Sequence, residues 1–155
     1  MATGHRAVHS LRTLYSWTAD EPNPTAHARR RLRDALTGLR LPPERVEDAL
    51  VMASELTANA QCHATTPCLL RLILTRAAVI VEVHDSDPRQ PVLPVRVDGA
   101  GTLDPEDDDV DSRLPTLAES GRGLQIVDAL SQGRWGFRSA HLGKAAWFVL
   151  ASAVR

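Results

Sequence analysis

The sequence predicts an α+β protein, a two-layer sandwich in which helices cover one face of a mixed, mostly antiparallel β-sheet. The first observation is that two β-rich runs, 68–75 and 78–85, are separated by only two residues, as in a hairpin. The second is a helical pattern of apolar residues over 43–63. Because hairpin-paired strands and helices occupy separate stretches of the chain, segregated layers are favoured over a doubly wound parallel sheet.

The size and composition of the chain indicate one globular domain. Its 155 residues fit a single core, expected over 10–152 with a flexible N-terminus at 1–9. Hydrophobic residues make up 43% and charged residues 24%, and the net charge of -1 gives no general attraction to nucleic acid or anionic membrane. The chain has no long apolar run, no signal-peptide core and only two cysteines. We therefore expect a soluble, cytoplasmic protein that contacts neither nucleic acid nor membrane.

The N-terminal half is expected to contain one strand and two helices. Residues 9–19 roughly alternate apolar and polar side chains, which is typical of a strand. The turn-forming residues 21–25 precede a helix expected over 26–39, which the following prolines end. Proline is tolerated in the first turn of a helix, so the second helix is expected from Pro43 to about His63.

The C-terminal half is expected to consist of a loop, a short helix and two paired strands. Residues 86–120 are rich in proline and acidic side chains, which indicates a long loop that is either a mobile functional lid or a disordered insert. The helix is expected from Gly123 to about Leu130. The strands follow at 134–139 and 144–151.

Two segments carry side chains that could bind a nucleotide and a cation. On the second helix, Glu55, Asn59 and His63 are spaced four residues apart, so they share one stripe at the border of the apolar face. A carboxylate and a carboxamide in that arrangement can serve as a base and as an oxygen ligand. Asp85 ends a strand and could accept a hydrogen bond from the amine of a purine. Each pattern taken alone is more often an exposed helix surface or a turn.

A third segment is rich in glycine. Gly121 and Gly123 flank Arg122 just before the expected helix. Glycines there let the backbone approach a phosphate closely, and the amides at a helix start attract an anion. The plain alternative is a tight turn that leads into a helix.

These segments, in this order, resemble the motifs of the GHKL, or histidine kinase-like, ATPases, which have the Bergerat fold. ELTANAQCHA (55–64) resembles the N box, VEVHDSDP (81–88) the G1 box and ESGRGLQIVDAL (119–130) the G2 box. The chain is also similar, over roughly residues 10–150, to the stand-alone anti-sigma-factor-like serine/threonine kinases of actinobacteria.

The resemblance implies that the ligand is ATP with Mg²⁺. Asn59 would hold the Mg²⁺, Glu55 would be the general base, and His63 occupies a position near the phosphates in relatives. Asp85 would receive the adenine amine. The phosphates would be wrapped by the glycine-rich segment, namely Gly121, Arg122, Gly123 and Leu124.

The resemblance also implies a role in transcription regulation by partner switching. The protein would phosphorylate an antagonist protein, sequester a sigma factor, or do both; relatives often work as dimers, and a homodimer is left open. Asp87, Glu119 and Ala145 depart from the family pattern. They favour the alternative of a catalytically inactive, nucleotide-gated or nucleotide-free protein-binding module.

Overall fold

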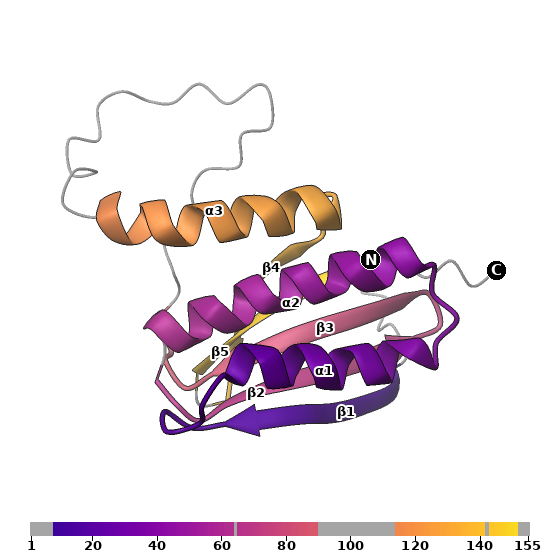
Figure 1. Ribbon diagram of the computed structural model, residues 1–155, viewed down its shortest axis with the longest axis horizontal. Coiled ribbons are helices and arrows are strands. Elements are labelled where there is room, and N and C mark those ends of the chain that lie inside the picture. Colours follow the sequence, from indigo (N-terminus) through magenta and orange to yellow (C-terminus); the bar gives the residue numbers. More distant parts are fainter. Residues whose placement is uncertain (1–7, 64, 90–113, 142, 152–155) are drawn as a thin grey trace, which may run out of the picture.

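The computed structural model describes residues 8–63, 65–89, 114–141 and 143–151, which form two layers (Figure 1). The described elements are, in chain order, β1 (Val8–Trp17), α1 (Pro24–Thr37), α2 (Pro43–His63), β2 (Cys68–Thr75), β3 (Ala78–Asp85), α3 (Leu114–Ser131), β4 (Trp135–Ala140) and β5 (Gly143–Ala151). Across these ranges, no helix is long and apolar enough to cross a membrane.

The strands form one sheet in the order β1-β2-β3-β5-β4, and each of these neighbouring pairs is antiparallel. The hairpin of β2 and β3 has the bounds that the sequence predicted. The α+β class, with helices packed against the sheet, is confirmed (Figure 1). The sheet is more regular than the mixed one expected, because every strand pair in the described part of the chain runs antiparallel.

The core lies between the sheet and the helices. Helix α1 begins at Pro24, in the first turn where the missing amide costs nothing, and it buries Ala28, Leu32 and Leu36 at four-residue spacing. Alternate residues of β3 point toward the helices, as a strand covered on one face requires. The largest fully buried side chains come from both layers: Leu32, Leu36, Leu50, Met52, Leu56, Leu70, Leu72, Val81, Val83, Val127, Phe148 and Leu150.

A buried ion cluster lies on the other face of the sheet. Glu82 of β3 is 4% exposed and alternates with the core-facing valines. Its carboxylate accepts hydrogen bonds from Arg138 Nε at 3.0 Å and Arg138 Nη2 at 2.8 Å, and it lies 2.6 Å from His84 Nε2. Burial alone would raise the pKa of Glu82, but the bonds from His84 and Arg138 outweigh burial, so its pKa is lowered.

Helix α3 begins at Leu114, so the prediction that it starts at Gly123 is wrong. Pro115 favours a loop in the sequence, yet proline is tolerated in the first turn of a helix. Glycine inside a helix costs about 1 kcal/mol relative to alanine. Leu124 and Val127 are buried in the core, and their burial offsets that cost.

The expected loop over 86–120 therefore ends before Leu114, and residues 90–113 lie outside the described part of the chain. The expected flexible N-terminus at 1–9 is also too long, because β1 begins at Val8. The domain bounds 10–152 stay a prediction.

One end of the sandwich gathers the segments that the sequence singled out. The C-terminal end of α2, the end of β3, the start of β5 and the first half of α3 all lie there, at the left of Figure 1. Ser86, just after β3, fixes this arrangement: its amide donates to the carbonyl of Thr65 at 2.8 Å, and its hydroxyl donates to the carbonyl of Pro67 at 2.8 Å. The loop after α2 is thereby tied to the strand that carries Asp85.

Candidate functional site

Helices α2 and α3 meet at Glu55 and Gly123. A Cβ atom built on Gly123 would lie 2.6 Å from Glu55 Oε2 and 3.5 Å from Glu55 Cδ. The Glu55 side chain therefore lies directly on the backbone of α3, and a side chain at position 123 would displace its carboxylate oxygen. The N-box and G2-box segments, far apart in the sequence, are in contact here.

The two predicted site residues of α2 have unused hydrogen-bonding capacity. Glu55 and Asn59 are both partly buried, and within the described ranges neither side chain makes a hydrogen bond or an ion pair. Leu56 and Ala60, their chain neighbours, are buried in the core, so Glu55 and Asn59 lie at its rim. His63 ends the helix, and its side chain is outside what the structure describes.

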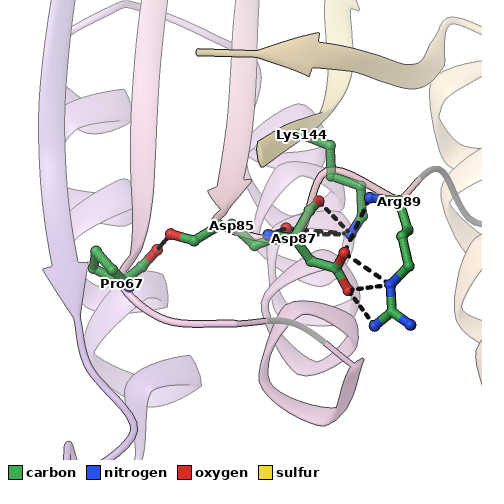
Figure 2. Close-up of polar contacts among 6 residues, drawn as sticks. Pro67, Asp85, Asp87, Arg89 and Lys144 are labelled. Carbon is green, nitrogen blue, oxygen red and sulfur yellow. Dashed lines mark hydrogen bonds and ion pairs between the residues drawn. The ribbon is translucent and has the colours of Figure 1, made fainter. Parts of the chain in front are cut away.

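Asp85 is the centre of a polar network at the end of β3 (Figure 2). Lys144 Nζ lies 3.2 Å from Asp85 Oδ1, 3.1 Å from Asp85 Oδ2 and 3.3 Å from the carbonyl oxygen of Asp87. The amide of Asp87 donates to Asp85 Oδ1 at 2.8 Å. The predicted purine acceptor is therefore held in place by the protein through hydrogen bonds to its Oδ1.

Arg89 extends this network toward the solvent (Figure 2). Its guanidinium donates to Asp87 Oδ1 at 3.0 Å and to Asp87 Oδ2 at 2.8 Å, and its amide also donates to Asp87 Oδ1. These hydrogen bonds hold the pKa of Asp87 well below its usual range. Asp87, one of the departures from the family pattern, is thus a buried, paired residue of the loop that follows β3.

Two strands approach so closely beside Asp85 that only glycine fits. Asp85 of β3 is in register with Lys144 of β5, and a Cβ on Gly143 would lie 1.9 Å from the carbonyl oxygen of Asp85. Any side chain at position 143 would therefore displace backbone. The close approach sets the position of Lys144 relative to Asp85.

The charge of Asp85 also reaches a neighbouring thiol. Cys68, the first residue of β2, is buried, and burial raises its pKa to about 11. The Asp85 carboxylate contributes to this rise, and Lys144 partly opposes it. The thiol next to the predicted purine acceptor is therefore protonated at neutral pH.

The glycine-rich segment does not form the cradle that the sequence predicted. Gly121, Arg122, Gly123 and Leu124 lie inside α3, where helical amides donate to carbonyl groups one turn earlier. Arg122 is exposed, and Leu124 is 4% exposed because it packs in the core. The expected free amides at a helix start are thus absent from these four described positions, and ATP binding by the segment stays a prediction.

The donor set fits Mg²⁺ bound together with a triphosphate. Oxygen ligands suit this ion, which usually takes one or two protein ligands and completes its shell with phosphates and water. Asn59 offers such an oxygen without a competing partner among the described residues. No cluster of three or more His, Cys, Asp or Glu side chains occurs in that part of the chain, so the described side chains do not form a full protein cage.

Sequence reasoning gave no role to Lys144, although it holds the predicted purine acceptor. Lys144 is the only lysine in the chain. It follows a glycine at the start of a strand, and Asp85 ends the strand beside it. The single lysine at the start of one strand and the aspartate at the end of another could have indicated the Lys144–Asp85 pair. The sequence did not show, however, that β3 and β5 are neighbours in the sheet.

Comparison with known families gives one result. A family model described as "Histidine kinase-like ATPase domain" matches residues 18–134, which include Glu55, Asn59, Asp85 and the glycine-rich segment. No curated protein matches the chain.

Proposed function

Because the chain belongs to the family of histidine kinase-like ATPase domains, we propose that it is an anti-sigma-factor-like serine/threonine kinase that acts by partner switching. It binds ATP with Mg²⁺, phosphorylates an antagonist protein and sequesters a sigma factor when the antagonist is phosphorylated. The family match supports ATP binding. The substrate protein and the sigma factor are our proposal.

The observation that carries this proposal is the contact between Glu55 and Gly123. A partly buried carboxylate without a partner among the described residues has not been recruited into a structural ion pair. It also lies on a glycine, with a Cβ distance of 2.6 Å that excludes any larger residue in this arrangement. A carboxylate without a structural partner can accept a proton from a substrate hydroxyl, as a general base must.

The chemistry assigned to this chain is the transfer of a phosphoryl group to a hydroxyl. Mg²⁺, when bound, would offset the negative charge of the phosphates. Glu55 takes the proton from the serine or threonine hydroxyl of the antagonist as the oxygen attacks phosphorus and ADP leaves. Asn59, one helical turn away, offers its carboxamide oxygen to the ion without adding charge.

Label transfer from ATP tests this proposal. Partners are first captured from the native host with and without ATP, and the captured antagonist is then incubated with labelled ATP and the protein. We expect Glu55→Ala to lower the transfer rate by about 100-fold or more, with a small change in ATP affinity. Glu47→Ala is the matched control, because Glu47 lies on the same helix, is 65% exposed and has only a 3.9 Å contact to Arg33. Wild-type transfer by Glu55→Ala would remove Glu55 from the mechanism.

A second candidate function is a nucleotide-gated or nucleotide-free binding module without turnover. The observation that favours it is Asp87, a departure from the family pattern, which is buried and held by Arg89. Calorimetry with ATP and with ADP separates the two candidates. Failure of both nucleotides to bind below millimolar concentration would leave protein binding as the function.

A further inference from the structure

Lys144 and Asp85 form a buried ion pair that the proposed chemistry does not use. The side chains are 10% and 7% exposed, respectively. Removing two charges from water costs several kcal/mol per ion, so a pair of this kind gives little net stability over apolar residues. A role other than stabilising the fold therefore explains better why a lysine occupies this position.

The contacts of Lys144 show that it acts through Asp85. An ammonium group has three hydrogens to donate. Three acceptor oxygens surround Nζ, namely both carboxylate oxygens of Asp85 and the carbonyl oxygen of Asp87. Nζ donates one hydrogen bond to Asp85 Oδ1 and one to the carbonyl oxygen of Asp87, and Oδ2 is its ion-pair partner. The effect of the ammonium is therefore on the charge and orientation of the carboxylate.

One oxygen of the carboxylate remains able to accept a hydrogen bond. Asp85 Oδ1 accepts hydrogen bonds from the amide of Asp87 and from Lys144 Nζ, whereas Oδ2 lies 3.1 Å from Nζ as its ion-pair partner and accepts no hydrogen bond from the described residues. An ionised carboxylate offers about four lone-pair positions and can only accept hydrogen bonds. Oδ2 therefore retains capacity for a donor from a ligand, and that donor must be an N–H or O–H group.

We propose that Lys144 is a positioning residue for base recognition: it keeps Asp85 ionised and oriented so that Oδ2 accepts a hydrogen bond from the exocyclic amine of a purine. This inference rests on the ATP binding of the proposed function. It goes further, because it makes the preference of Asp85 for a purine with an exocyclic amine depend on Lys144. Purine riboside triphosphate, which lacks the amine, cannot supply the donor and binds more weakly.

The consequence of removing the ammonium is a dependence on pH. In Lys144→Met the buried carboxylate loses its counter-charge, and such a group binds a proton more readily. A protonated Asp85 both donates and accepts, so its preference for the amine falls. The preference of this variant should therefore weaken as the pH is lowered, whereas that of the wild type should stay constant.

The charged groups that contact Asp85 or its loop do not change charge in the tested range, and His84, the preceding residue, pairs with Glu82 on the other face of the sheet. Burial raises the pKa of Cys68 to about 11, and Arg89 holds the pKa of Asp87 well below its usual range. Arg89 itself stays charged. ATP and the analogue carry the same triphosphate, so groups near the phosphates, such as His63, affect both alike. The ratio of the two affinities, measured between about pH 5.5 and pH 8, therefore reports on the base site.

Calorimetric titration of the full chain with ATP and with purine riboside triphosphate tests the proposal. The wild type should bind ATP about ten-fold tighter than the analogue at every pH, because a hydrogen bond to a charged group is involved. Lys144→Met should show a ratio near one at low pH that rises with pH. Lys144→Arg, which keeps the charge, should restore a ratio that does not change with pH.

A second neutral variant covers the case that Lys144→Met does not fold. Lys144→Gln keeps a donor beside Asp85 but removes the charge, and it should show the same pH-dependent loss of preference. A wild-type ratio in Lys144→Gln across the pH range would overturn the role of Lys144 and leave ATP binding intact. Failure of the wild type to bind ATP at all would instead overturn the proposed function, and this inference with it.

Discussion

Replacing Gly123 with alanine should slow phosphoryl transfer while leaving the fold at least as stable. The new Cβ would lie 2.6 Å from Glu55 Oε2, and ordinary contacts of a Cβ begin at 3.4 Å. The carboxylate oxygen must therefore withdraw by about 0.8 Å. The displaced atom is the end of a flexible side chain, so the movement itself costs little stability.

The two effects of the Gly123→Ala substitution have opposite signs. Alanine replaces glycine inside α3, which stabilises a helix by about 1 kcal/mol and, for a chain of 155 residues, raises the melting temperature by roughly 2 to 4 °C. A catalytic group displaced by about 1 Å can lose up to about 100-fold in rate. We therefore expect a transfer rate lowered by about 10-fold to 100-fold in a protein that melts higher than the wild type.

Thermal unfolding by circular dichroism and label transfer from ATP to the antagonist measure both effects. Gln125→Ala is the control, because Gln125 is an exposed residue of the same helix, and neither quantity should change much. A Gly123→Ala protein that is stabilised and transfers label at the wild-type rate would refute Glu55 as the base. A protein destabilised by more than about 1 kcal/mol would show that the Glu55 side chain cannot move aside as cheaply as we infer.

Three further predictions follow from other contacts. Glu82→Gln should lower the free energy of unfolding by about 2 kcal/mol at neutral pH. Because folding lowers the pKa of Glu82, the stability that its charge contributes is lost as the pH falls below about 4. Chemical denaturation should therefore give the variant and the wild type the same stability at that pH. Gly143→Ala should cost more than about 2 kcal/mol and weaken ATP binding in calorimetry, since its Cβ would fall 1.9 Å from the Asp85 carbonyl oxygen. Iodoacetamide at pH 8 should alkylate exposed Cys62 in the native protein and Cys68 only after unfolding. Mass spectrometry detects both products, and equal alkylation rates of the two cysteines in the native protein would contradict the burial of Cys68.

Local patterns in the sequence were sufficient to predict most of the elements. The β2–β3 hairpin follows from two apolar runs with a two-residue connection, and α2 follows from its apolar stripe and the proline at its start. The start of α3 was missed, because Pro115 and the glycines at 121 and 123 all disfavour a helix locally. Tertiary packing of Leu124 and Val127 overrides that local preference.

The sequence by itself determined the kinds of groups at the site: the carboxylate and carboxamide one turn apart on α2, the aspartate at the end of β3 and the glycines near position 122. Only the tertiary structure decided that Glu55 lies on Gly123 and that Lys144 holds Asp85. Spacing along one helix follows from its fixed geometry. A contact between segments far apart in the chain depends instead on strand order and on how closely two backbones approach, and local periodicity carries no information about either.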